Sequence, residues 1–253
     1  MSEAFAMTSD GLTTDDFLGG ALRLRQPVRG LRGGADGVLL AAAVRASVGM
    51  KVLDVGTGVG VVALCLARRQ PDLDVDGLEI QPDLAALARE NVKLNGMEQR
   101  VRILEGDLAQ PPDAIAPNSY DMVVSNPPYF AADRSMASPK KERATGRTEG
   151  ALDLAGWVRC CLRLVKPRGS LCVIFRAERL ASLLATLQGR AGDILVYPLW
   201  PRQGQAAKLV IVTARKGSRG ALTLHPGLVL HDATGAYSEA AEAILRGGAA
   251  LPI

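Results

Sequence analysis

The stretch from Val52 to Gly60 limits the fold of this chain more than any other. It is an apolar run interrupted by one acid, followed by three closely spaced glycines and then by an apolar segment without glycine or proline up to Arg69. This order predicts a buried parallel strand, a tight turn and a helix over residues 61–69. Because glycine adopts left-handed conformations, a ligand can approach such a turn closely. The pattern predicts an open α/β sheet that binds a ligand at this turn.

Two classes of ligand compete for a glycine-rich turn of this type. A dinucleotide-binding turn has the spacing Gly-x-Gly-x-x-Gly. Here the spacing is Gly-x-Gly-x-Gly, Val61 stands at the third dinucleotide position, and an acid lies two residues before the first glycine. The pattern is similar to the first motif of class I S-adenosylmethionine (SAM)-dependent methyltransferases, whose ligand has an ammonium group and no pyrophosphate. We therefore expect SAM to contact Asp54, Gly56, Thr57, Gly58 and Gly60.

The next two predicted strands also end in side chains suited to a ligand. Strand 75–80 ends on Glu79 and Ile80, where a carboxylate can accept hydrogen bonds from both ribose hydroxyls, each worth about 1.5–3 kcal/mol. A solvated glutamate is the alternative. After a helix over 83–95, strand 101–104 leads to Asp107 and Leu108. In the methyltransferase pattern, Asp107 matches the acid that meets the adenine amino group, and Leu108 lies against the ring.

A fourth apolar run, Met122 to Val124, stops at Asn126-Pro127-Pro128-Tyr129. Neither proline can donate to a sheet, so the strand ends in a stiff elbow at the edge where open α/β sheets bind ligands. The Asn126 amide oxygen and a backbone carbonyl can accept from an exocyclic amine, while the Tyr129 ring stacks on a base. A bare proline-rich turn more often only ends a strand. Here, however, each of the four predicted strands ends in a side chain suited to a ligand at the same edge of the sheet, and this favours a binding site for a planar amine.

The net charge of +4 hides an uneven distribution. Residues 1–121 hold 12 basic and 17 acidic residues, whereas residues 122–219 hold 17 and 6. A basic excess that begins at the predicted base pocket favours nucleic acid over a small-molecule substrate, although a solvated basic face is the simpler explanation. Four of these cations lie in a polar loop expected to contact the substrate: Arg134, Lys140, Lys141 and Arg143. RNA affinity should then fall with salt, with a log–log slope of about −0.7 to −0.9 per phosphate contacted.

Other features exclude several classes. No apolar run approaches the roughly 18–20 residues that a membrane span needs. The segment from Met1 to Asp16 is acidic, so we expect a frayed tail rather than a secretory signal. The four cysteines have no Cys-x-x-Cys spacing and there are only two histidines, which predicts reduced core thiols, no metal site and a cytoplasmic protein.

We expect the chain to have three parts. Residues 1–35 form a tail, a small hairpin and a basic lid; residues 36–220 form the cofactor-binding domain; and residues 221–253 form an extension. In the first part, a hairpin over 17–25 leads through Gln26 and Arg32, both candidate substrate contacts, to a helix capped by Asp36. After the elbow we expect a helix with Trp157 in the core, a strand–helix unit and a final hairpin over 194–214. The extension carries a helix over 238–246.

Residues 17–253 together resemble the bacterial tRNA adenine-N6 methyltransferases that modify the base beside the anticodon of a valine tRNA. The resemblance rests on Gln26-Pro27, the segment Asp36-Gly-Val-Leu-Leu-Ala, the turn 54–60, the elbow, and the late Pro-Arg-x-Gly and Leu-Val-Leu-His-Asp segments. The elbow motif itself is shared with release-factor glutamine and ribosomal RNA guanine-N2 methyltransferases. In this chain Thr57 stands where the family often has cysteine, and loop 31–34 lacks the aromatic residue that often precedes its arginine.

The resemblance implies a Rossmann-like α/β fold: a seven-stranded, mostly parallel sheet with an antiparallel C-terminal hairpin and helices on both faces. It implies SAM as cofactor, tRNA as partner, and Asn126, Pro127 and Tyr129 as catalytic residues, with Asn126 also touching the cofactor. Three other functions stay open. They are protein glutamine or ribosomal RNA methylation, a non-catalytic SAM- or RNA-binding module, and a nicotinamide dehydrogenase, which the glycine spacing disfavours.

Overall fold

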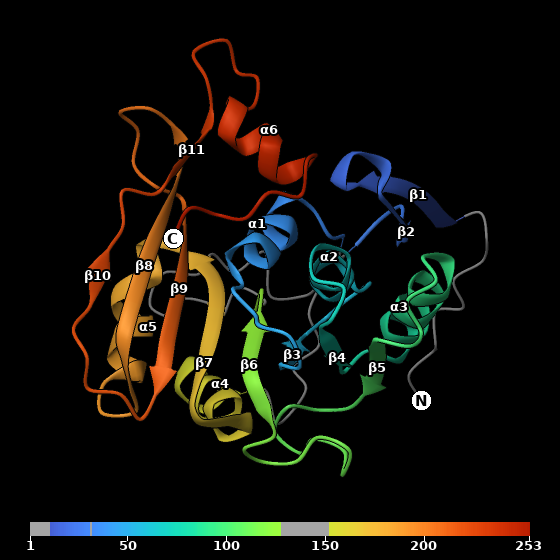
Figure 1. Cartoon of the computed structure of the whole chain (residues 1–253), viewed down its shortest axis with the longest axis horizontal. Coiled ribbons are helices and arrows are strands. Elements are labelled where there is room, and N and C mark those ends of the chain that lie inside the picture. Colours follow the sequence, from blue (N-terminus) through green and yellow to red (C-terminus); the bar gives the residue numbers. More distant parts are fainter. Residues whose placement is uncertain (1–10, 31, 128–151) are drawn as a thin grey trace, which may run out of the picture.

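The computed structural model describes residues 11–30, 32–127 and 152–253, and its centre is one twisted sheet (Figure 1). Seven strands form the body of the sheet in the order β8-β9-β7-β6-β3-β4-β5. Their bounds are β3 Lys51–Val55, β4 Asp74–Glu79, β5 Val101–Glu105, β6 Tyr120–Ser125, β7 Val165–Arg176, β8 Ala191–Arg202 and β9 Leu209–Lys216. Only β9 runs antiparallel to its neighbours. The predicted mostly parallel sheet with an antiparallel C-terminal hairpin is confirmed.

Two short strands at the β8 edge make the sheet larger than the predicted seven strands. β10 (Thr223–Leu224) and β11 (Leu228–His231) both pair in parallel with β8, which gives nine strands in the described part of the sheet. Strands this short have too few residues for a hydrophobic pattern to predict their length or the strand they pair with. The C-terminal extension is thereby joined to the sheet by backbone hydrogen bonds.

The strand order reverses at β3, which pairs with β4 on one side and with β6 on the other. The chain builds β3, β4 and β5 outward and then returns to the opposite side for β6. Such a reversal leaves a crevice at the carboxyl ends of the two central strands, because the connections leave them in opposite directions. The glycine turn follows β3 and Asn126 follows β6, so both motifs open onto this crevice.

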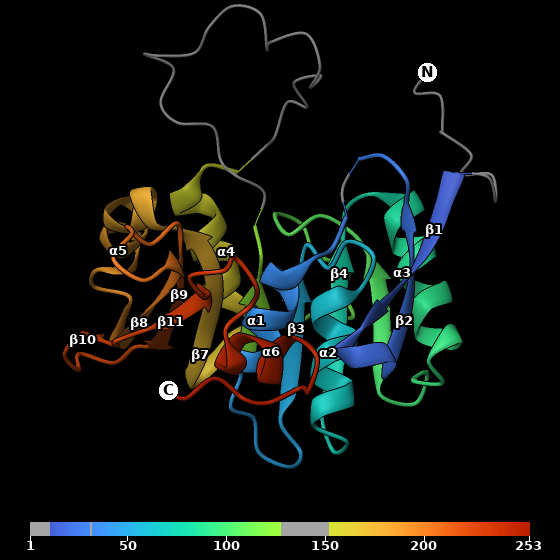
Figure 2. The same cartoon turned by 90° about the horizontal axis from the view of Figure 1, so that it is seen from above.

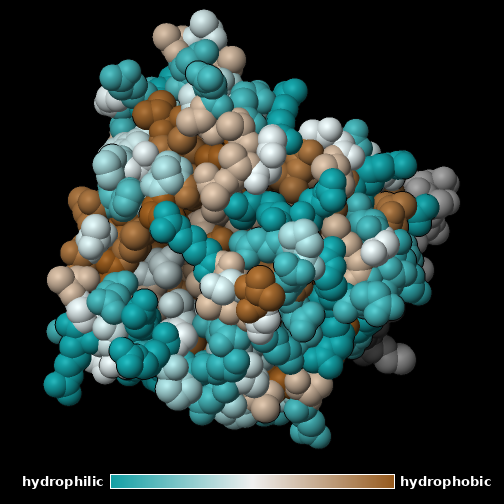
Figure 3. Space-filling model, viewed as in Figure 1, coloured by the Kyte–Doolittle hydropathy of each residue, from teal (hydrophilic) through white to brown (hydrophobic). Residues whose placement is uncertain are grey.

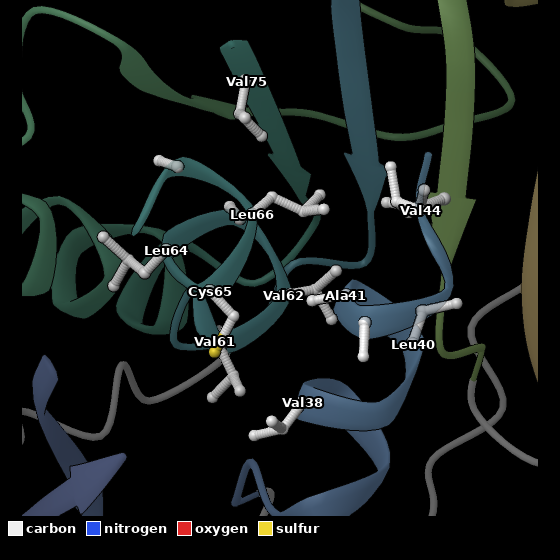
Figure 4. Packing of buried hydrophobic residues seen from close by; sticks show 14 of the residues in the cluster. Val38, Leu40, Ala41, Val44, Val61, Val62, Leu64, Cys65, Leu66 and Val75 are labelled. Atoms are coloured by element: carbon white, nitrogen blue, oxygen red, sulfur yellow. The ribbon is translucent and has the colours of Figure 1, made fainter. Parts of the chain in front are cut away.

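Helices cover both faces of the sheet (Figures 1 and 2). One face carries α1 (Ala35–Ala43), α2 (Val61–Arg69) and α3 (Pro82–Leu94), and the other carries α4 (Leu154–Leu164) and α5 (Leu180–Leu187). Figure 4 shows Val38 and Ala41 of α1 near Val61 and Val62 of α2. Helices α1 and α2 pack so closely that a Cβ atom at Gly37 would lie 2.9 Å from Val61 Cγ1. Trp157 of α4 is buried, as predicted.

An outer layer from the two ends of the described chain covers α1–α3 (Figure 1). Strands β1 (Leu12–Phe17) and β2 (Leu22–Pro27) form an antiparallel hairpin that starts within the segment predicted to be frayed, because Thr13 pairs opposite Gln26. Helix α6 (Glu239–Leu245) packs on α1. The Leu251 N–H donates to the Ala42 carbonyl at 2.9 Å. In the ranges that the structure describes, no helix is long and apolar enough to cross a membrane.

Helix α1 begins differently from the prediction. We expected Asp36 as its N-cap, but the helix starts at Ala35 and Gly34 holds the cap position without a side-chain bond. Asp36 lies in the first turn instead, where its negative charge still faces the positive end of the helix dipole. Burial raises the pKa of Asp36, and the nearby Arg176 partly opposes that rise.

Candidate cofactor and base-binding site

The glycine turn after β3 has the open backbone that its sequence predicted. Gly56, Gly58 and Gly60 have φ values of 71°, 58° and 92°, in the left-handed region that favours glycine. A Cβ atom at Gly56 or Gly58 would meet no atom within 4 Å, so the space above the turn is free for a ligand. The Gly56 and Thr57 N–H groups donate to the Leu78 carbonyl at 2.8 and 3.1 Å, which fixes the turn against β4.

Asp54 lies beneath this turn as a buried carboxyl group with one oxygen unused. Its side chain is 1% exposed, and Oδ2 accepts from the Thr57 hydroxyl at 2.6 Å. Oδ1 is buried without a hydrogen-bond partner among the described residues. Burial raises the pKa of Asp54 from 3.8 to about 7, while the Thr57 hydroxyl and the Ala63 N–H lower it and the Glu79 carboxylate adds a smaller rise. A ligand with a positive charge would compensate this unpaired oxygen, and the ammonium group of SAM is such a ligand.

Glu79 ends β4 beside the turn and connects two loops of the site. Its side chain is buried; Oε2 accepts from the Gly58 N–H at 2.8 Å and Oε1 from the Gln81 N–H at 3.0 Å. Each carboxylate oxygen can accept a second bond, so both remain able to receive ribose hydroxyls. Ile80, the next predicted contact, is 60% exposed, an unusual degree for a large apolar side chain that follows a buried strand.

The loop after β5 brings the predicted adenine contacts to the same edge. The Gly106 N–H donates to the Glu79 carbonyl at 2.9 Å, which places this loop beside the end of β4. Asp107 is exposed, and its Oδ1 accepts from the Ala109 N–H at 2.8 Å, whereas Leu108 is buried. The loop thus offers an exposed carboxylate next to an apolar side chain.

The end of β6 is attached directly to the end of β3. The buried Ser125 hydroxyl donates to the Val55 carbonyl at 2.6 Å, so the elbow and the glycine turn are adjacent. Asn126 is exposed and its side chain has no partner among the described residues, while Pro127 is buried. Tyr129 and the predicted substrate contacts Arg134, Lys140, Lys141 and Arg143 lie outside the described residues.

The segment between β2 and α1 supports the cofactor turn. Gln26 is 1% exposed; its Oε1 accepts from the Gly33 N–H and its Nε2 donates to Asp15 Oδ2, both at 2.7 Å. Arg32 donates to the same Asp15 oxygen at 2.5 Å. A Cβ atom at Gly33 would lie 2.1 Å from Val61 Cγ2, so this loop packs tightly on the start of α2. Gln26, proposed from the sequence as a substrate contact, holds this loop in place instead, because both ends of its amide are already bonded.

One residue important to the site, Asn91 on α3, escaped the sequence interpretation. It is fully buried, and its Nδ2 donates to the carbonyls of Val59 and Arg25, each at 2.9 Å. Its Oδ1 accepts from the Arg25 N–H at 2.7 Å. Asn91 therefore connects the glycine turn to β2. The signal was present, since an asparagine lies on the apolar face of α3, one heptad after Leu84.

The described part of the chain contains no group of three or more side chains able to hold a metal ion, and Cys65, Cys160, Cys161 and Cys172 are free thiols. A sheet that reverses at β3, an open glycine turn over an uncompensated carboxyl, a strand-end glutamate and an Asn-Pro elbow define a class I SAM-dependent methyltransferase. In agreement, residues 35–143 match the family model of the methyltransferase small domain.

Sequence relatives make the class more specific. The tRNA1(Val) (adenine(37)-N6)-methyltransferase of Aeromonas salmonicida (strain A449) is 34% identical over 209 residues, which cover 81% of this chain and 85% of the relative. The protein of the same name from Yersinia pestis (strain Pestoides F) is 33% identical, with 81% and 82% covered. The chain belongs to the family of these tRNA1(Val) (adenine(37)-N6)-methyltransferases.

Solved structures support the fold. A predicted O-methyltransferase from Agrobacterium tumefaciens is 25% identical and superposes with a TM-score of 0.71, covering 85% of this chain and 98% of that one. TYW2 of P. horikoshii in complex with MeSAdo superposes with a TM-score of 0.55 over 84% of this chain and 74% of that one, at 14% identity. SAM is the cofactor of this protein. The open space above Gly56 and Gly58 and the unpaired Oδ1 of Asp54 are compatible with such a positively charged ligand.

Proposed function

We propose that the protein transfers the methyl group of SAM to N6 of an adenine in tRNA, and that the target is the adenine 37 of tRNA1(Val) for which its relatives are named. Identity of 34% over 81% of the chain to a protein of this name supports this function over ribosomal RNA or glutamine methylation. A tRNA substrate also supports the expected cytoplasmic location.

The observation that carries the proposal is the free amide of Asn126 at the strand reversal. Its neighbours Ser125 and Pro127 are buried, and the bond from Ser125 to Val55 holds the backbone beside the cofactor turn. The Asn126 side chain itself is exposed and makes no bond to any described residue. A rigid backbone with an unused amide oxygen is suited to accept from an exocyclic amine, and adenine N6 offers two protons for this purpose.

Positioning accounts for the chemistry. When bound, SAM supplies an electrophilic methyl group on a positively charged sulfur. The adenine amino lone pair is delocalised into the ring and is a poor nucleophile. Bonds from N6 to Asn126 Oδ1 and to the Pro127 carbonyl would favour a pyramidal nitrogen whose lone pair faces that methyl group. Tyr129 would stack on the everted base, a contact worth about 1–3 kcal/mol, comparable with the cost of unstacking.

The test is methyl transfer from tritiated SAM to four acceptors in parallel: tRNA from a strain that lacks the modification, ribosomal RNA, RNA-free protein extract, and buffer. We expect label only in tRNA, recovered as N6-methyladenosine after digestion to nucleosides. Label in protein or in ribosomal RNA would replace the proposed acceptor. Label in tRNA as another nucleoside would retain the substrate and refute the proposed atom.

A further inference from the structure

The basic excess of residues 122–219 is divided between the two edges of the sheet. The cofactor turn and Asn126 open at the carboxyl edge of the parallel strands, but seven of the described cations gather at the opposite, amino edge. We call this set the amino-edge patch; it consists of Arg163, Lys166, Arg168, Arg190, Arg215, Lys216 and Arg219. The patch therefore lies apart from the site described above.

Strand pairing and hydrogen bonds bring these residues together from four segments. Ala191 pairs opposite Lys216, and Ser170 pairs opposite Arg215, which aligns the starts of β7 and β8 with the end of β9. The Gly217 N–H donates to the Arg190 carbonyl at 2.8 Å. Lys216 Nζ donates to the Val165 carbonyl and to Asn118 Oδ1, each at 2.7 Å. The patch is thus one continuous surface.

Most cations of the patch lack an acidic partner. Lys166 pairs with Asp121 at 2.8 Å, and Arg215 lies 3.7 Å from Asp193. The other five have no carboxylate partner within the described ranges, and Arg163, Arg168, Arg190 and Arg219 are exposed. Figure 3 shows mostly hydrophilic side chains at the lower left of the molecule, where β9 ends in the same view of Figure 1. Mutual repulsion makes such a cluster unfavourable unless an anion binds there.

The backbone at Arg168 is strained. It has a φ of 64°, in the left-handed region where a residue with a Cβ costs about 1–2 kcal/mol relative to glycine. The turn before it already contains a proline and the residue after it is glycine, so the position is a tight turn in which glycine or asparagine would be more stable. An exposed arginine is nevertheless present at this position. Leu18, Asn118 and Asp193 also have a positive φ, so the strain supports a role for Arg168 only together with the charge of the patch.

Helix α4 continues the positive charge from the amino edge toward the site. Arg159 and Arg163 are exposed, and their i,i+4 spacing puts both on the same outer face, an arrangement that is slightly destabilising for like charges. The helix begins just after Asp153 and ends at the start of β7, so it runs from the carboxyl edge to the patch.

A glycine-lined depression lies next to the patch. It has a volume of about 640 Å³, and Gly189, Gly192, Gly217 and Gly220 form part of its wall beside Arg219. A Cβ atom at Gly189 or Gly217 would meet nothing within 4 Å, whereas at Gly192 and Gly220 the protein's own chain fills that space. The wall is therefore open at Gly189 and Gly217, and phosphate contacts in nucleic-acid complexes come from arginines such as the exposed Arg219.

We propose that the amino-edge patch and the outer face of α4 bind the phosphate backbone of the substrate RNA at a distance from the methylated base. This inference rests on the proposed function. Ser125 pairs with Val173 and Met122 with Ser170, so regular strand separates the elbow from the turn that carries Arg168 by three residues, about 10 Å at roughly 3.3 Å per residue. An RNA that fills both places must extend well beyond its target loop. The patch thus selects folded tRNA over short RNA fragments carrying the same loop.

The experiment compares whole tRNA with the isolated anticodon stem-loop as methyl acceptors. The test variant combines Arg168→Gly, Arg190→Ala and Arg219→Ala, and the control is Lys93→Ala, which removes an exposed cation in the last turn of α3 at the other end of the sheet. For whole tRNA we expect KM to rise about tenfold or more and the log–log salt slope of binding to weaken by about 2 units, since each lost phosphate contact contributes roughly 0.7–0.9. The stem-loop and the control should be unaffected.

Stability and binding measurements make the outcomes distinct. Arg168→Gly alone should keep or raise the melting temperature because it relieves the left-handed strain, so a loss of binding in that variant could not be attributed to unfolding. Unchanged KM for whole tRNA, or an equal rise for the stem-loop, would overturn the proposal. If the wild type methylated neither RNA, the proposed function would fail, and equilibrium binding of tRNA to the wild type and the triple variant would still decide the role of the patch.

Discussion

Replacing Asp54 with Asn should remove a pH dependence of stability that the wild-type protein carries. Burial raises the pKa of Asp54 from 3.8 to about 7, and the Thr57 hydroxyl lowers it only in part. Between these two values the folded protein holds a proton that the unfolded chain has lost, so the free energy of unfolding falls as the pH rises from about 4 to about 7. A difference of about three pKa units corresponds to about 4 kcal/mol.

At pH 8 the ligand-free wild type therefore contains a buried negative charge with an unpaired oxygen, whereas the amide of Asp54→Asn is neutral at every pH. We expect the two proteins to have similar stability at or below about pH 4, and the variant to be more stable by about 1–2 kcal/mol at pH 5 and by up to about 4 kcal/mol at pH 8. For a chain of this length, that difference raises the melting temperature by about 8 °C or more. The control is Asp83→Asn, which changes an exposed carboxyl on α3.

The assay is thermal unfolding without cofactor at several pH values between 5 and 8, followed by SAM titration at the same values. The positive charge of SAM should favour ionised Asp54, so wild-type affinity should increase as the pH rises toward about 7, by at most about tenfold per pH unit. The variant should bind SAM more weakly and with a flat pH profile. Melting temperatures that follow the same pH curve in both proteins would refute the assignment of a buried, uncompensated carboxylate.

Three further substitutions test the elbow, the loop before α1, and Asp76 of β4, which pairs with Lys51 and Arg102. Asn126→Ala should abolish turnover while calorimetry still detects SAM binding; normal turnover would remove Asn126 from the mechanism. Gly33→Ala should weaken SAM binding and destabilise the protein by about 1–3 kcal/mol, because the new Cβ would overlap Val61. Denaturant unfolding measures the change in stability, and an unchanged unfolding midpoint would contradict the tight packing. Asp76→Asn should cost about 3 kcal/mol at pH 7. Burial raises the pKa of Asp76, but bonds from Arg102, Tyr120 and Lys51 outweigh burial and lower it. The wild type should therefore have the larger free energy of unfolding above pH 3.8, and this difference should disappear as the pH falls below 3.8.

The backbone of the site could be predicted from the sequence because its signals are local. Three glycines, an acid and the strands around them require only the residues in their own segment to form the turn, and Glu79 lies at a strand end that hydrophobic pattern alone reveals. The cap of α1 was misassigned because Asp36 and Gly34 are both acceptable caps, and only the packing of the neighbouring loop on Val61 chooses between them.

Contacts between distant segments could not be predicted in the same way. The roles of Gln26 and Asn91 depend on partners that lie far away along the chain, such as the Val59 carbonyl for Asn91. A buried amide and a solvent-facing one have the same letter in a sequence. An asparagine on an apolar helix face is the one clue available, and it predicts burial without naming the partner.

Charge distribution along the chain gave the right class of partner but a misleading location. The chain from 122 to 219 contains several strands of the sheet. The residues at the start of each strand and those at its end lie at opposite edges of the sheet. Arg176 and Arg202 consequently lie at the carboxyl ends of β7 and β8, while Arg168 is the fourth residue of β7 and Arg190 lies just before β8. A basic excess that looks like one binding segment in sequence is therefore two surfaces in the fold. A long folded RNA can use both surfaces at once, whereas a small anionic substrate at the carboxyl edge would leave the amino-edge cations without a purpose.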